Sequence, residues 1–224
     1  MSANITNTKK VTLLGMLAAI AYVVIFLCHF LIPPVAGFLT LDVKDTIIAI
    51  SGFIFGPLSA ALVAIVVAAV EMVTISATGP IGLVMNILSS CCFACVAAFI
   101  YKRKHTLKGA ITGLIVGCLA ATAVMLLWNV LITPLYLNQP REAVIGMLIP
   151  TLLPFNLGKY ILNAAITMLI YKPIVTALRK ANLLAPSSSD AAPVQKKQHL
   201  GTILVSLLIL ITCILGFLAW QGVL

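Results

Sequence analysis

Long apolar runs separated by short polar segments are the main feature of the chain, and they predict helices that cross a membrane. Such runs occupy residues 11–32, 58–76, 81–101, 109–133 and 154–173, and a last one occupies 200–220. Each run is long enough to cross the hydrocarbon core of a bilayer as a helix. A shorter apolar segment at 46–55 ends before a Gly-Pro pair and predicts one more helix.

Residues 181–198 interrupt this pattern, because they are rich in Ser, Ala, Pro and Gln. That composition is typical of a flexible linker. We therefore expect a six-helix membrane domain over residues 1–180, a flexible cytoplasmic linker over 181–198 and an additional transmembrane helix over 199–224. No convincing internal repeat divides the chain, so an inverted-repeat transporter is not favoured.

Hydrophobic residues make up 62% of the chain and charged residues only 8%. A soluble domain of this length could not bury so much apolar surface, since a large part of any small domain stays exposed. The composition therefore predicts an all-α integral membrane protein. The six cysteines fall inside the apolar runs without further ligands at metal-site spacing, so a packing role is favoured over metal binding or redox chemistry.

The formal net charge of +9 comes from Lys and Arg residues that cluster at alternate ends of the apolar runs. The clusters lie at residues 9–10, 102–108, 172–180 and 196–197. Basic clusters in this arrangement mark cytoplasmic loops. We therefore expect a multi-pass protein of the cell membrane with a cytoplasmic N-terminus and an external C-terminus, and we do not expect nucleic-acid binding.

Polar residues inside the apolar runs lie at a similar depth, in the outer third of the membrane. They come from four predicted helices and are Glu71, Asn86, Asn129, Asn156 and Lys159. A charged or amide side chain in hydrocarbon is costly unless it faces a polar cavity or another polar group. Either each residue reaches separately for water or a neighbouring helix, or together they line a pocket that is open to the outside.

The last helix of the membrane domain favours the pocket. Asn156, Lys159 and Asn163 are three and four residues apart, so they share one face of that helix. Their amide and ammonium groups suit a planar heterocycle with carbonyl and ring-nitrogen edges, or a polyol. Glu71 would then either pair with Lys159 or bind hydroxyl groups of the ligand.

Sequence motifs of catalysis give no support for an enzyme. The chain contains no HExxH, GxSxG or P-loop motif, and Glu71 is the one acid within the predicted spans. We therefore expect neither catalysis nor ATP hydrolysis by this chain, and no cofactor or metal.

Several segments resemble the riboflavin-specific S components of energy-coupling factor (ECF) transporters. They are "LTLDVKD", "GFIFGP", "TGPIGLVMN", "LLWNVLITPLY" and "LPFNLGKYILN", which follow one another in order within residues 10–180. The resemblance implies an S-component bundle of six helices that captures riboflavin from outside. It also implies partners, namely a transmembrane T component and two ATP-binding-cassette ATPases that drive uptake.

The resemblance also implies roles for particular residues. Asn156 and Lys159 would contact the flavin ring, and Asn129 and Asn86 would belong to the same site. The loop from Leu41 to Asp45, which includes Asp42 and Lys44, would close over the ligand.

On the first predicted helix, the small residues Gly15, Ala18 and Ala19 would face the T component. Residues 181–224 go beyond the usual pattern of the family and predict a simple added anchor. The alternatives are an S component for another vitamin or a flavin analogue, and a membrane scaffold without a transport role.

Overall fold

The computed structural model describes residues 7–180 and 196–220, which form helices joined by short connections. The α-helices are α1 (Asn7–Leu31), α2 (Lys44–Phe55), α3 (Pro57–Thr74), α4 (Gly79–Ser90), α5 (Val96–Arg103), α6 (Leu107–Leu137), α7 (Arg141–Gly146), α8 (Leu153–Lys180) and α9 (Lys196–Trp220). Two π-helical segments, Cys91–Cys95 and Leu148–Leu152, lie directly before α5 and α8.

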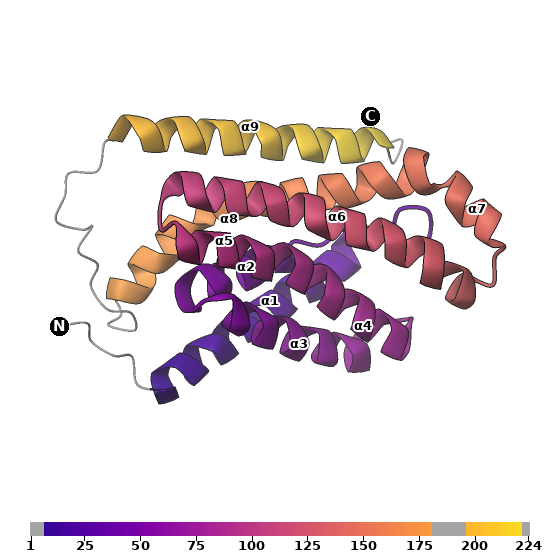
Figure 1. Cartoon of the computed structure of the whole chain (residues 1–224), viewed down its shortest axis with the longest axis horizontal. Helices are drawn as coiled ribbons and strands as arrows, with labels where there is room; N and C mark the ends of the chain where they lie inside the picture. Colours follow the sequence, from indigo (N-terminus) through magenta and orange to yellow (C-terminus); the bar gives the residue numbers. More distant parts are fainter. Residues whose placement is uncertain (1–6, 181–195, 221–224) are drawn as a thin grey trace.

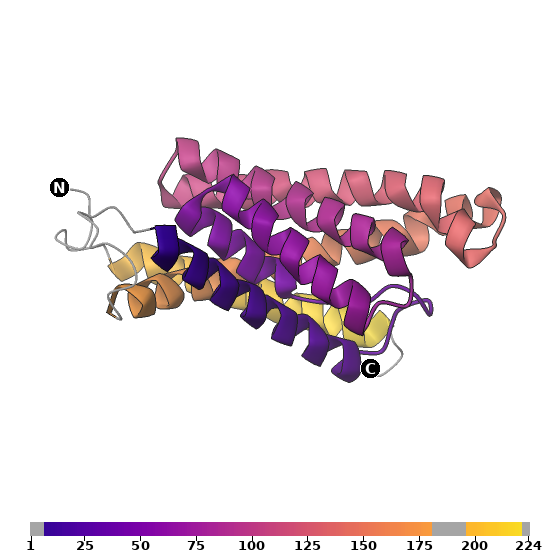
Figure 2. The same ribbon diagram turned by 90° about the horizontal axis from the view of Figure 1, so that it is seen from below.

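The long helices lie side by side along one direction (Figures 1 and 2). Within the described residues, five helical stretches are long and apolar enough to cross a membrane. They are Asn7–Leu31, Pro57–Thr74, Gly79–Arg103, Leu107–Leu135 and Leu148–Leu178. This confirms the predicted all-α membrane protein.

Helix α2 forms the centre of the bundle. With 12 residues it is only about 18 Å long, which is too short to cross a bilayer alone. Every residue from Lys44 to Phe53 is buried, because α1, α3, α5 and α8 pack around it. Polar side chains at its start are therefore held inside the protein, whereas the resemblance implied that Leu41–Asp45 is a loop that closes over the ligand.

Close packing of α6 on the preceding helix depends on two glycines. A Cβ atom at Gly113 would lie 2.6 Å from the carbonyl oxygen of Ala97, and one at Gly117 would lie 2.5 Å from that of Phe93. Both glycines therefore let the α6 backbone approach its neighbour more closely than any other residue would. Small residues serve the same purpose in many membrane helix pairs.

We expect Gly117→Ala to destabilise the folded protein by about 1–3 kcal/mol, because the neighbouring backbone must move to admit the methyl group. Gly15→Ala is the matched control, since a Cβ atom there meets nothing within 4 Å. Unfolding in detergent, followed by tryptophan fluorescence, measures both. Equal stability of the two variants would contradict the close approach.

Two segments differ from the simple helices that the sequence predicted. The apolar run predicted over 81–101 is interrupted by the π-helical segment Cys91–Cys95. Helices α4 and α5 are therefore two parts of one long helical stretch, Gly79–Arg103, with a change of hydrogen-bond pattern between them. The connection after α6 is not an extended loop, since it contains the short helix α7 and the second π-helical segment.

Helix α9 packs along α8, and Figure 1 shows it at the edge of the bundle. It begins at Lys196, so its first turn takes up the end of the segment predicted as a linker over 181–198. Residues 181–195 of that segment lie outside the described residues. Phe217 of α9 packs against a small apolar cluster around Val144 and Phe155.

Candidate ligand-binding site

A cavity of about 450 Å³ lies between α1, α3, α4, α6, α8 and the connection after α1. Its wall combines apolar side chains with amides, hydroxyls and charged groups. The lining residues are Ile25, His29, Pro34, Gly37, Phe38, Leu39, Thr40, Glu71, Ile75, Ser76, Ala77, Thr78, Met85, Asn86, Ser89, Met125, Asn129, Phe155, Asn156, Lys159 and Tyr160. A mixed wall of this kind is typical of small-molecule sites.

The polar residues that the sequence placed at one depth all line this cavity. Glu71 comes from α3, Asn86 from α4, Asn129 from α6, and Asn156 and Lys159 from α8. The four helices therefore bring these side chains to one place, as expected from their depth. The remaining predicted ligand contacts, Leu41, Asp42, Lys44 and Asn163, are not in the wall and lie behind it or beside it.

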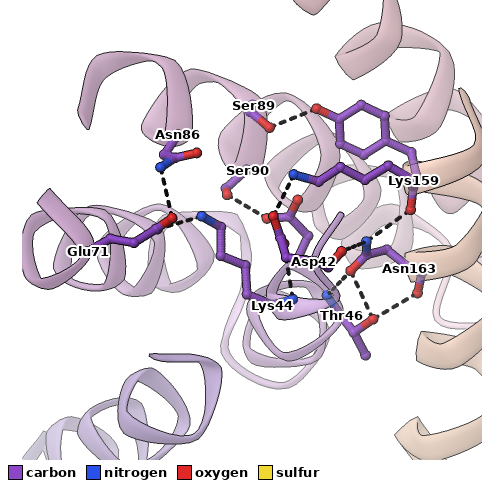
Figure 3. Close-up of polar contacts among 11 residues, drawn as sticks. Asp42, Lys44, Thr46, Glu71, Asn86, Ser89, Ser90, Lys159 and Asn163 are labelled. Atoms are coloured by element: carbon purple, nitrogen blue, oxygen red, sulfur yellow. Dashed lines mark hydrogen bonds and ion pairs between the residues drawn. The ribbon is translucent and has the colours of Figure 1, made fainter. Parts of the chain in front are cut away.

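An ion pair connects α2 to α3 behind the cavity (Figure 3). The Lys44 Nζ lies 2.5 Å from the Glu71 Oε2, and the Asn86 Nδ2 donates to the Glu71 Oε1 at 3.0 Å. Lys44 is only 2% exposed. The Glu71 carboxylate is thus held between an ammonium group of α2 and an amide of α4, which offsets the cost of placing a charge inside the bundle.

A second ion pair connects the end of the first loop to α8. The Lys159 Nζ lies 2.7 Å from the Asp42 Oδ2, and the Asp42 Oδ1 accepts from the Lys44 backbone N–H at 3.3 Å. Asp42 is only 2% exposed, and the Lys159 ammonium group together with the Lys44 backbone N–H offsets the cost of burying its charge. Asp42 is therefore a charged anchor for the loop.

Asn163 holds α2 against α8. Its Oδ1 accepts from the Thr46 backbone N–H at 2.9 Å, and its Nδ2 donates to the Asp42 carbonyl oxygen at 2.9 Å. The Thr46 Oγ1 lies 3.1 Å from both oxygens of Asn163. Because Asn163 is fully buried and its bonds are made within the protein, it positions the start of α2 rather than lining the cavity.

The direct pairing of Glu71 with Lys159, one of two alternatives from the sequence, is wrong. Each of the two residues has a different ion-pair partner, Lys44 for Glu71 and Asp42 for Lys159. The physical reason is that the segment counted as a surface loop enters the bundle and supplies both countercharges. The sequence-based view that Glu71 is the one acid within the membrane region missed this contribution.

Sequence reasoning also missed the contact that Asp45 makes and three hydroxyl groups near the site. Ser90 donates to the Asp45 Oδ1 at 2.5 Å, and the Ser89 hydroxyl lies 2.7 Å from that of Tyr160. The Tyr160 ring stacks on Phe93 with their centroids 5.5 Å apart. The signal that could have revealed these contacts is the pair of adjacent serines, Ser89 and Ser90, within an apolar run.

The amides of Asn129 and Asn156 are oriented by their own helices. The Asn129 Nδ2 donates to the Met125 carbonyl oxygen at 2.7 Å, and the Asn156 Nδ2 donates to that of Leu152 at 2.8 Å. The Thr133 Oγ1 donates to the Asn129 Oδ1 at 2.8 Å. Since an amide nitrogen carries two hydrogens, each amide can keep this bond and still donate to a ligand.

The connection between α1 and α2 has two parts. Residues 34 and 37–40 line the cavity, whereas Asp42 and Lys44 fix the end of the connection to α8 and α3. The part that covers the cavity thus precedes the segment Leu41–Asp45 that the resemblance indicated. Leu41 itself packs beside an apolar cluster around Val35 and Leu39.

The small residues of α1 fall on two different faces. Gly15 and Ala19 are exposed, but Ala18 is only 6% exposed and packs into the chain's own core. The prediction that Ala18 faces a partner is therefore wrong, because its face of α1 is already covered by α2 and α3. Gly15 and Ala19 lie one turn apart on the open face.

Among the residues that the structure describes, no group of three or more His, Cys, Asp or Glu side chains could hold a metal ion. The cavity instead offers hydrogen-bonding groups from several helices and an apolar wall. Such a site binds a small organic molecule by shape and by hydrogen bonds.

Comparison with known proteins places this arrangement in a family. Residues 9–171 match the family of ECF transporter substrate-specific components. The chain belongs to this family. The match covers all the helices that line the cavity and ends before α9.

This substrate-specific component is similar to two relatives over almost their full lengths. The riboflavin transporter RibU of Staphylococcus aureus is 31% identical over 79% of this chain and 96% of its own length. The riboflavin transporter FmnP of Bacillus subtilis is 29% identical over 79% of this chain and 99% of its own length. The family resemblance seen in the sequence is thus confirmed.

A solved structure titled as the S component of a bacterial ECF transporter has the same fold. The two structures superpose with a TM-score of 0.66 at 31% sequence identity. The superposition covers 78% of this chain and 99% of the solved chain. The S-component fold that the sequence predicted is therefore confirmed. The substrate-specific component described here is a membrane protein with several apolar helices that belongs to an ECF transporter.

Proposed function

We propose that this chain is the riboflavin-binding subunit of an ECF-type importer, which captures the vitamin from outside the cell. The observation that carries the proposal is the cavity lined by amides and charged groups from four helices, in a chain similar to two riboflavin transporters over nearly their whole lengths. The chain would act as a binding protein without catalytic activity or a cofactor of its own.

Riboflavin has two chemically different parts, and the cavity offers different groups to each. The flavin ring system is planar and carries carbonyl and ring-nitrogen acceptors along one edge, which suit the amides of Asn129 and Asn156 and the ammonium group of Lys159. Tyr160 and Phe155 add apolar surface for the faces of the ring.

The ribityl chain carries hydroxyl groups, which can both donate and accept hydrogen bonds. Glu71 and Asn86 lie together in the wall formed by α3 and α4, and their carboxylate and amide suit these hydroxyls. Both residues keep their contacts with the protein, so the ligand would add bonds to a preformed arrangement. A preformed site reduces the entropy lost on binding.

Titration of the purified full-length protein with riboflavin, followed by quenching of flavin fluorescence, tests the function directly. We expect Asn156→Ala to weaken binding by about 1–3 kcal/mol, the cost of leaving a buried polar partner of the ligand unpaired. Asn7→Ala, at the exposed start of α1, is the matched control and should bind like the unchanged protein.

Three results would count against the proposal. Binding of a different vitamin in place of riboflavin would assign the same cavity to another substrate. Failure to bind any small molecule would favour a membrane scaffold, in which the polar side chains only hold helices together. Unchanged affinity in Asn156→Ala would show that the ligand lies elsewhere.

We infer that the partners are a transmembrane T component and two ATP-binding-cassette ATPases, which convert ATP hydrolysis into release of the vitamin inside. The family membership supports this assignment. Gly15 and Ala19 leave a shallow, exposed strip on α1 where a partner helix can approach closely. The basic clusters support a cytoplasmic N-terminus at the plasma membrane.

We expect Gly15→Leu to stop riboflavin uptake by cells while leaving the affinity of the purified protein unchanged, because the larger side chain holds the partner helix away. Gly216→Leu, at an exposed glycine of α9, is the control and should leave uptake intact. Uptake of labelled riboflavin and fluorescence titration measure the two effects. Loss of binding in Gly15→Leu would instead give the residue a role in the bundle itself.

We assign ligand binding to residues 1–180 and treat the last helix as an addition. This division rests on the cavity, since none of its lining residues comes from α9.

A further inference from the structure

A second cavity, of about 690 Å³, lies between α6, α8 and α9. Its wall is almost entirely apolar. The lining residues are Ile111, Leu114, Ile115, Cys118, Leu119, Leu157, Ile161, Ala164, Ala165, Met168, Gly201, Val205, Ser206 and Ile209. It is separate from the vitamin cavity, because the two have no lining residue in common.

Filling this second cavity with water, or leaving it empty, is energetically unfavourable. A buried water needs two to four polar partners, and Ser206 is the one hydroxyl side chain in the wall. An empty space would deprive the lining side chains of dispersion contacts. At the depth of the hydrocarbon core, an acyl chain supplies those contacts without any hydrogen-bonding demand.

Basic residues lie one helical turn beyond the cavity on all three of its helices. Lys108 precedes the lining residue Ile111 by three positions, Lys172 follows Met168 by four, and Lys197 precedes Gly201 by four. The start of α6, the end of α8 and the start of α9 lie at the same end of the bundle in both views (Figures 1 and 2). These three positions of the backbone therefore lie toward one end of the bundle.

The three helices that line this cavity carry basic residues but no acidic ones. The sequences of α6, α8 and α9 contain neither Asp nor Glu. A negatively charged headgroup near this end is attracted by several Lys residues and repelled by no carboxylate of the same helices. Basic residues at the cytoplasmic membrane surface favour anionic lipids in this way.

We propose that the space between α6, α8 and α9 is a binding site for an anionic phospholipid of the inner leaflet. One acyl chain fills the apolar cavity, and the phosphate lies near Lys108 and the first turn of α9. Helix α9 then has a role beyond anchoring, because it supplies one wall of the site. The proposal does not depend on which vitamin the other cavity binds.

Native mass spectrometry of the full-length protein in mild detergent tests the site with defined lipids. Phosphatidylglycerol and phosphatidylcholine with identical acyl chains are titrated separately. We expect phosphatidylglycerol to bind more tightly, and Lys108→Gln with Lys197→Gln to weaken its binding about fivefold for each lysine removed. Lys9→Gln with Lys10→Gln, at the corresponding end of α1, should leave its binding unchanged.

A second pair of variants tests the cavity itself. Gly201→Phe places a ring where a Cβ atom meets nothing within 4 Å, and it should displace the lipid from the wall of the cavity. Gly216→Phe makes the same change on the same helix outside the cavity and should retain the lipid. Ala164→Leu fills the cavity from α8 and provides an independent variant if Gly201→Phe does not fold.

Each variant is first compared with the unchanged protein by gel filtration and thermal unfolding without lipid, so that loss of lipid is not mistaken for loss of fold. Equal binding of the two lipids would overturn the headgroup assignment. Full retention of lipid by folded Gly201→Phe and Ala164→Leu would overturn the acyl-chain site.

Discussion

Lys159→Met should lower the stability of the folded bundle by about 3–5 kcal/mol, because it leaves the Asp42 carboxylate buried without its ion-pair partner. Asp42 is 2% exposed, and its Oδ2 lies 2.7 Å from the Lys159 Nζ. Removing the lysine therefore costs far more than the loss of one contact to a ligand. Unfolding in detergent without vitamin measures the effect.

A second substitution, at Asp42, distinguishes the effect of an unpaired buried charge from simple loss of packing. Adding Asp42→Asn to Lys159→Met removes the isolated charge and should restore most of the lost stability. Lys9→Met, at an exposed position in the first turns of α1, is the control and should change stability by less than about 0.5 kcal/mol. If the double variant is no more stable than Lys159→Met, the ion pair is not what stabilises the loop.

Lys44→Met should cost about 3 kcal/mol, because Glu71 then keeps only the hydrogen bond from Asn86 to balance its buried charge. Glu71→Gln in the same chain should recover much of this loss, since a neutral amide needs no countercharge. The interaction energy in this double-mutant cycle should exceed that of the cycle between Glu71 and Lys159.

That comparison of cycles distinguishes the observed pairing from the alternative that the sequence left open. Both cycles use stability in detergent without ligand, so the vitamin cannot couple the residues. A larger interaction energy for Glu71 with Lys159 than for Glu71 with Lys44 would contradict the geometry of the ion pairs.

Helices and their depths could be predicted because they depend on local features of the sequence. An apolar run of sufficient length specifies a spanning helix, and the position of a polar residue within the run specifies its depth. Asn86, Asn129 and Lys159, which the sequence predicted at one level, line the same cavity.

Pairings could not be predicted, because they depend on the order and rotation of the helices around the bundle. Depth alone allowed Glu71 to meet Lys159, whereas the actual partners are Lys44 and Asp42. The short helix α2 is the main reason for the error. The sequence predicted this helix over 46–55 but assigned the polar residues just before it to a loop, whereas α2 begins at Lys44 and its neighbours bury that polar start.

For the same reason, the sequence could not predict which face of a helix is buried in the bundle. Ala18 and Ala19 are adjacent in the sequence and equally small, but one is buried in the core and the other is exposed. Nothing in the local composition distinguishes the two. The packing of α1 on α2 and α3 decides which of them a partner can reach.

The sequence separation of the two ion pairs has a consequence for the assembly of the protein during synthesis. Lys44 and Glu71 are 27 residues apart and both enter the membrane with the first three helices, so their charges can neutralise each other early. Asp42 is 117 residues from Lys159 and has no such partner until α8 has been made and inserted. The first connection therefore cannot reach its final position while the ribosome is still translating α6, and the cavity of about 450 Å³ becomes complete only when the last of its lining helices arrives.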